Sequence, residues 1–158
     1  MRDLSWLKIP GMAIGFAAGL LVGALAVVAS APTGFVIVAA LGLGIPLAIF
    51  GIIYDVLLDA GKLNFGYAAP TALYGVLTFP IARLLQELLL TAIFGEGITL
   101  QQESGVLSFL AYQGIMGFGY GIGFLMIHGQ IIEMSAWRQY RKLTKEEREQ
   151  PQTAEKQV

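Results

Sequence analysis

Long apolar stretches separated by short polar segments dominate this sequence. Four of them carry few or no charged residues and cover residues 11–31, 33–54, 67–94 and 105–132. At 1.5 Å per residue, each is long enough to cross the hydrocarbon core of a bilayer, which is about 30 Å thick. The runs are continuous rather than alternating, which favours helices over a β-barrel. We therefore predict an all-α integral membrane protein with four transmembrane helices within residues 1–134.

A tight turn is expected between the first two runs, at residues 30–34, because residues 11–54 otherwise form one uncharged stretch. Pro32 disfavours helix at the residue before it, and Gly34 permits the dihedral angles of a sharp connection. Arg2 and Lys8 precede the first run, as basic residues do in a signal peptide. That run is longer than the roughly 7–15 apolar residues of a signal peptide, so we expect it to be the first helix of a hairpin.

The positions of Lys and Arg predict the orientation in the membrane. Nine of the ten lie before the first run, between the second and third runs, or after the fourth. Residues 30–34 and 95–104 hold none, and Arg83 lies within the third run. By the positive-inside rule both termini are cytoplasmic. We therefore expect a multi-pass membrane protein, located in a prokaryotic inner membrane.

The composition supports this class of protein. Hydrophobic residues make up 56% of the 158 positions and charged residues 13%, about half the share typical of soluble domains. The chain has 20 Gly, no Cys and a formal net charge of −1. These values exclude a disordered chain, a disulfide-rich secreted domain and an ordinary soluble enzyme. We expect membrane lipids and other integral membrane subunits as partners, with a homo-oligomer as an alternative, and no nucleic acid.

Glycines recur at four-residue spacing in two of the runs. The positions are Gly11, Gly15, Gly19 and Gly23 in the first run, and Gly117 and Gly121 in the fourth. A step of four keeps them on one helix face, where the missing side chains allow a second backbone to approach closely. This glycine-zipper pattern has two interpretations. The face packs against another helix of the same chain, or it docks another subunit.

Three polar residues lie within the third run: Arg83, Gln86 and Glu87. Arg83 and Glu87 are four residues apart and can form a pair on one helix face. Ionisable groups inside a membrane are costly, and they mark functional sites or pair within the bundle. We favour structural pairing, and a transport or proton pathway is the alternative.

His128, near the end of the fourth run, is the only histidine. One histidine and no cysteine exclude the common zinc sites and haem bound by two histidines of this chain. We predict no metal, no cofactor and no catalytic residue, although a quinone or proton site shared with another subunit stays open. Asp55 and Asp59 end the second run, where carboxylates oppose the helix dipole. Lys62 is the nearest candidate to compensate them.

Residues 135–158 are predicted to form a basic and polar cytoplasmic tail. Trp137, Arg138, Arg141 and Lys142 open it and are expected at the membrane surface, where aromatic rings and basic side chains meet anionic headgroups.

Three functions follow from these features. The favoured one is a non-catalytic accessory subunit of a larger respiratory or transport complex, docked through small-residue helix faces. The alternative is a small homo-oligomeric transporter or channel with Arg83 and Glu87 in its pathway. The third is a lipid- or quinone-handling membrane enzyme that uses His128.

Overall fold

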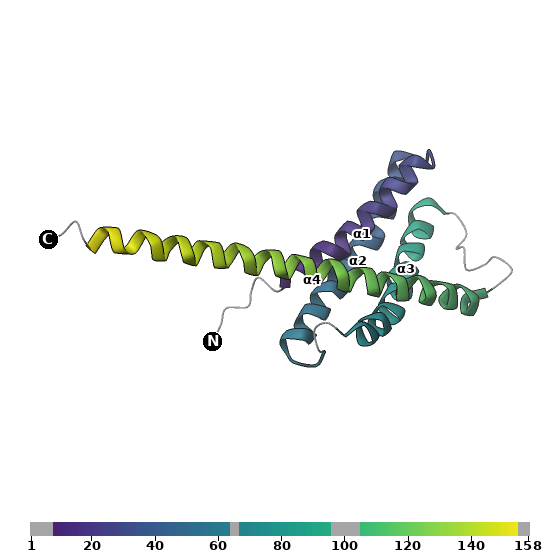
Figure 1. Cartoon of the computed structure of the whole chain (residues 1–158). Coiled ribbons are helices and arrows are strands. Elements are labelled where there is room, and N and C mark those ends of the chain that lie inside the picture. Colours follow the sequence, from purple (N-terminus) through teal and green to yellow (C-terminus); the bar gives the residue numbers. More distant parts are fainter. Residues whose placement is uncertain (1–7, 64–66, 96–104, 155–158) are drawn as a thin grey trace.

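The structure, a computed structural model, describes residues 8–63, 67–95 and 105–154, and these ranges form four α-helices (Figure 1). They are α1 (Lys8–Val28), α2 (Thr33–Asp59), α3 (Ala68–Phe94) and α4 (Gly105–Ala154). Each helix contains a segment long and apolar enough to cross a membrane, as the four apolar runs predict. The all-helical architecture with four candidate spans is that of a multi-pass membrane protein.

The turn between α1 and α2 differs in detail from the sequence-based prediction. Ser30 adopts a left-handed conformation with φ of 58°. Its N–H donates to Val27 O at 2.9 Å, and the Ala31 N–H donates to Ala26 O at 3.0 Å. This pair of hydrogen bonds is a Schellman motif, which satisfies the last carbonyls of α1. The prediction that Gly34 supplies the unusual dihedral angles was wrong, because Gly34 lies inside α2.

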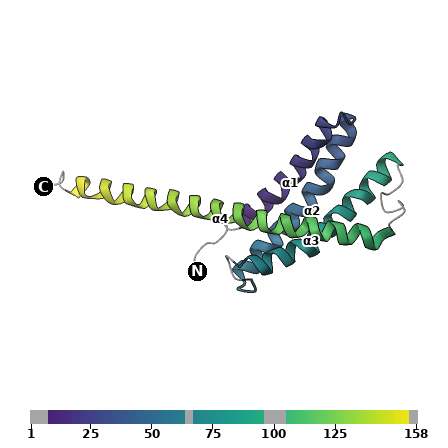
Figure 2. The ribbon, with the colours of Figure 1, turned by 45° about the vertical axis from the view of Figure 1, so that its right-hand side comes forward.

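α4 is one continuous helix of 50 residues. Its candidate span ends at Met134, and the helix continues without interruption into the segment predicted to be the cytoplasmic tail. Figure 1 shows the C-terminal part, in yellow, extending away from the other three helices. In both views α4 crosses α1, α2 and α3 obliquely (Figures 1 and 2).

The glycine face of α1 packs against α2 of the same chain. The contacting pairs are Gly11–Gly51, Gly15–Leu47, Gly19–Gly44 and Gly23–Ala40. A Cβ atom on Gly15 would overlap the backbone carbonyl of Leu47, and one on Gly23 would lie 2.7 Å from Ala40 Cβ. Such close approach lets van der Waals packing hold two helices together where lipid supplies no hydrophobic driving force. The internal-packing interpretation therefore describes this face, and a second subunit could occupy it only by displacing α2.

The glycines of α4 serve the second helix pair in the same way. Gly117 lies against the backbone of Gly75, and Gly121 lies against Thr71 and Ala72 of α3. Both are buried, whereas the intervening Gly119 has open space around its Cβ position. In both the α1–α2 and the α3–α4 contacts, small residues allow the two helix backbones to approach closely.

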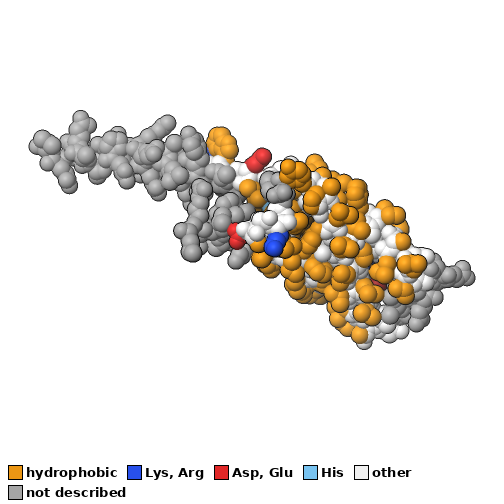
Figure 3. All heavy atoms as spheres, turned by 90° about the horizontal axis from the view of Figure 1, so that it is seen from below, with side chains coloured by type: hydrophobic (Ala, Val, Ile, Leu, Met, Phe, Trp, Pro, Cys, Tyr) orange, Lys and Arg blue, Asp and Glu red, His pale blue; other side chains and the backbone are white. Residues whose placement is uncertain are grey.

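The outer surface is apolar over the length of the candidate spans. Figure 3 shows hydrophobic side chains covering most of this face, with the most prominent charged side chains near the α4 extension. Large apolar residues such as Leu21, Leu77 and Ile115 are more than half exposed. Apolar surface of this extent is typical of contact with lipid or with other membrane helices.

Candidate functional site

A buried acid–histidine pair joins α2 to α4. His128 Nε2 and Asp55 Oδ1 lie 2.6 Å apart and share a hydrogen bond, and neither side chain is exposed. The second carboxylate oxygen of Asp55 accepts the backbone N–H of Gly11 at 2.9 Å. Asp55 therefore contacts the beginning of α1 as well as α4.

This arrangement shows how Asp55 is accommodated near the C-terminal end of its own helix. The dipole of α2 disfavours a carboxylate there, but the beginning of α1 favours one, because the N–H groups of its first turn point toward the anion. The prediction that Lys62 compensates Asp55 was wrong. The Asp55 carboxylate instead bonds to His128 and to the Gly11 N–H. Lys62 and Asp59 are both exposed.

Aromatic side chains enclose His128. The Phe124 ring stacks on the imidazole with centroids 5.5 Å apart, and the Tyr54 ring meets it edge-on at 5.7 Å. Tyr54 Oη and Thr71 Oγ1 are 2.8 Å apart and share a hydrogen bond, and the Thr71 hydroxyl also reaches Tyr67 O at 3.1 Å.

One connected group of residues therefore links all four helices. Its members are Gly11 of α1, Tyr54 and Asp55 of α2, Thr71 of α3 and His128 of α4. We call this group the Asp55–His128 node. Hydrogen bonds are directional, so the node fixes the relative positions of helices that otherwise meet through apolar contacts.

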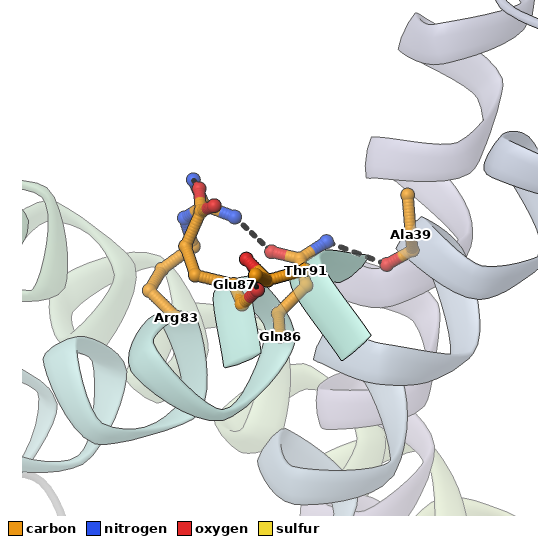
Figure 4. Close-up of polar contacts among 5 residues, drawn as sticks. All are labelled: Ala39, Arg83, Gln86, Glu87 and Thr91. Carbon is orange, nitrogen blue, oxygen red and sulfur yellow. Dashed lines mark hydrogen bonds and ion pairs between the residues drawn. The ribbon is translucent and has the colours of Figure 1, made fainter. Parts of the chain in front are cut away.

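A second polar cluster joins α3 to α2 (Figure 4). Arg83 donates to Gln86 Oε1 and, at 2.8 Å, to Glu87 Oε1. Gln86 in turn donates its Nε2 to the carbonyl oxygen of Ala39 at 2.6 Å. The pairing of Arg83 with Glu87 that the four-residue spacing predicts is present in the structure. Gln86 and Glu87 are buried, and the Arg83 side chain is 23% exposed.

Replacing Gln86 with leucine is expected to lower the free energy of unfolding by about 1–3 kcal/mol. The change removes the bond to Ala39 O and takes one acceptor from the buried side of Arg83. Unfolding in mixed detergent micelles measures this loss. Leu85→Ala on the exposed face of α3 is the matched control and is expected to change stability much less, so equal effects of the two substitutions would contradict a connecting role for Gln86.

The predicted surface residues are only partly described. The Arg141 guanidinium lies 4.8 Å from the centroid of the exposed Trp137 ring, which is a cation–π arrangement. The α4 backbone continues through Arg138 and Lys142, but their side chains lie outside the part of the chain whose side chains the structure describes.

No protein-family model, curated protein or solved structure matches this chain. Within residues 8–63, 67–95 and 105–154, no three His, Cys, Asp or Glu side chains gather closely enough to hold a metal ion.

Two apolar grooves flank α4. One, of about 740 Å³, lies between α3 and the first part of α4 and is lined by residues that include Val76, Pro80, Leu110, Gly114 and Phe118. The other, of about 480 Å³, lies between α1 and the middle of α4 and is lined by residues that include Ala13, Ala17, Tyr120, Gly123 and Ile131. Because they are shallow and apolar, these grooves suit hydrocarbon or a helix face.

Sequence reasoning singled out His128 but missed its partner. The sequence pattern pairs Asp55 with Asp59 at the end of a helix, and it does not single out Tyr54 or Thr71. One signal was available: the only histidine and an aspartate lie near the ends of two runs that the predicted topology places on the same side of the membrane.

Proposed function

We propose that this chain is a non-catalytic accessory subunit of a larger membrane complex, with both termini cytoplasmic in a prokaryotic inner membrane. The proposal is supported by the bonding partners of the polar side chains within the spans. Asp55, Arg83, Gln86, Glu87 and His128 are each bonded to another group of the same chain. Asp55, Gln86 and His128 connect helices, and Arg83 is bonded to Gln86 and Glu87 within α3. Polar residues that pair inside the bundle in this way suit a structural subunit.

The surface available to a partner is the groove between α3 and α4. The glycine face of α1 is covered by α2, so the small-residue docking expected from the sequence has to use other positions. Gly114 is one of them, because a Cβ atom there would have only Val76 Cγ1, at 3.7 Å, as a neighbour. A partner helix could therefore approach α4 closely at this glycine.

Quantitative recovery of partner subunits tests the proposal. The tagged chain is extracted from native membranes in gentle detergent, and co-purifying membrane proteins are measured by mass spectrometry. We expect one defined set of subunits at fixed stoichiometry with the natural chain and with Gly119→Leu. Gly114→Leu fills the groove and is expected to reduce that recovery at least several-fold. Equal recovery with both variants would exclude this groove as the docking surface, and absence of any stoichiometric partner would exclude the subunit role.

Partial exposure of Arg83 favours transport as the second candidate. In that case Arg83→Gln and Glu87→Gln each abolish solute flux in reconstituted vesicles while the protein stays assembled. The third candidate, an enzyme acting through His128, has less support because that side chain is fully enclosed.

A further inference from the structure

The guanidinium of Arg83 is only partly bonded within its own chain. It donates to Gln86 Oε1 through one terminal nitrogen and to Glu87 Oε1, at 2.8 Å, through the other. An arginine side chain carries five N–H donors, so these two bonds leave the other three without an acceptor in the described part of the chain. The side chain is 23% exposed, and in Figure 4 the guanidinium lies at the end of the cluster away from Ala39.

These donors lie inside the apolar part of the bundle. Gln86, which accepts from Arg83, also bonds to Ala39 O. Ala39 comes about 9 Å after the first residue of α2, and Gln86 comes about 12 Å before the last residue of α3. Residues 33–38 and 88–94, which separate the cluster from those helix ends, carry no charge. An exposed N–H group at this depth meets hydrocarbon, which offers no acceptor, so leaving it unbonded is costly.

Arg83 lies on the side of α3 that borders the α3–α4 groove. Val76 and Pro80 line this groove. Arg83 follows Val76 by seven residues and Pro80 by three, and these spacings keep all three on one face of the helix. A partner helix that lies in the groove and continues along α3 therefore passes Arg83 about one turn beyond Pro80.

The charge of the cluster determines which kind of acceptor fits. Arg83 and Glu87 form an ion pair, so the cluster is already neutral. A further carboxylate would add an uncompensated negative charge within the membrane, which is costly. A lipid phosphate is charged as well, and it lies outside the hydrocarbon core. A side-chain amide or hydroxyl oxygen accepts an N–H group without adding charge, and such side chains form hydrogen bonds between transmembrane helices.

We propose that a transmembrane helix of another subunit lies in the α3–α4 groove and supplies an uncharged acceptor to Arg83. The acceptor is the side-chain oxygen of an asparagine, glutamine, serine or threonine. Gly114 allows the helix to approach α4 closely, and the directional bond to Arg83 fixes its position along the groove. This helix belongs to the partner that the accessory-subunit proposal requires, and the inference rests on that proposal.

Partner recovery from a variant of the cluster tests the contact. The tagged full chain is extracted from native membranes in gentle detergent, and co-purifying membrane proteins are quantified by mass spectrometry. Arg83→Leu/Glu87→Leu removes the donors together with both charges, so no charge stays uncompensated. It is expected to lower recovery of the stoichiometric partner about tenfold, the effect of one or two lost interhelical hydrogen bonds. Leu85→Ala, an exposed position on the opposite face of α3, is the control and is expected to leave recovery unchanged.

Electron cryo-microscopy of the natural complex identifies the acceptor even if the double variant fails to fold. We expect an amide or hydroxyl oxygen of a neighbouring subunit within hydrogen-bonding distance of the Arg83 guanidinium. A carboxylate, a lipid phosphate or no polar group there would overturn the inference, as would full partner recovery with the double variant. Those results would leave the subunit role intact. Absence of any stoichiometric partner of the natural chain would exclude both the subunit role and the inference.

Discussion

Replacing His128 with leucine is expected to lower the free energy of unfolding by about 2–4 kcal/mol. The substitution leaves Asp55 buried with only the Gly11 N–H as a partner. Removing one member of a buried hydrogen-bonded pair leaves the other polar group without that partner, and the smaller leucine also loses the imidazole's ring contacts with Tyr54 and Phe124. Reversible unfolding in mixed detergent micelles, followed by circular dichroism, measures the difference.

The double variant Asp55→Leu/His128→Leu is the control for this prediction. Replacing both members of a buried pair with apolar residues is often close to neutral, so the double variant is expected to be more stable than His128→Leu alone. The Gly11 N–H loses its acceptor in this variant, which keeps the recovery incomplete. If the two variants were equally stable, the cost would come from lost packing around the imidazole, and the coupling of Asp55 to His128 would be refuted.

The second large effect is expected for Gly15→Leu, which should prevent α1 from packing against α2. A Cβ atom there overlaps the backbone carbonyl of Leu47, and backbone cannot move aside as a flexible side chain can. We expect a loss of more than about 4 kcal/mol, the range in which single substitutions act through severe overpacking. Thermal stability in detergent and the yield of folded protein measure the loss.

Gly119→Leu is the matched control for Gly15→Leu. It makes the same chemical change, but nothing lies within 4 Å of the added Cβ position. We expect stability within about 1 kcal/mol of the natural chain, with a small gain possible because leucine favours helix over glycine. Normal folding of Gly15→Leu would show that α1 and α2 do not pack as closely as the structure indicates.

The four spans could be predicted because each is set by local composition. A continuous apolar run of sufficient length has few alternatives to a transmembrane helix. The spacing of Arg83 and Glu87 likewise predicted their pairing, since a four-residue step on a helix decides which side chains meet. The end of α1 was less predictable, because Ser30 rather than a glycine takes the left-handed position.

The Asp55–His128 node could not be predicted from local patterns. Asp55 and His128 are 73 residues apart, and they meet only because α4 crosses the α1–α2 hairpin near the beginning of α1. That crossing depends on Gly117 and Gly121 packing against α3, which no single-helix periodicity specifies. The glycine spacing predicted close packing, but choosing between α2 and another subunit required the tertiary structure.

The claim that this chain is a subunit of a larger complex is tested most directly by the size of the membrane particle that contains it. Membrane patches are excised from native membranes with an amphipathic polymer, without detergent, and the mass and composition of particles that contain the tagged chain are measured. The accessory-subunit account predicts a particle much heavier than this chain, with other membrane proteins at fixed stoichiometry. A particle that contains only this chain, alone or as a homo-oligomer, would contradict that account and make Arg83 and Glu87 the first residues to test for transport.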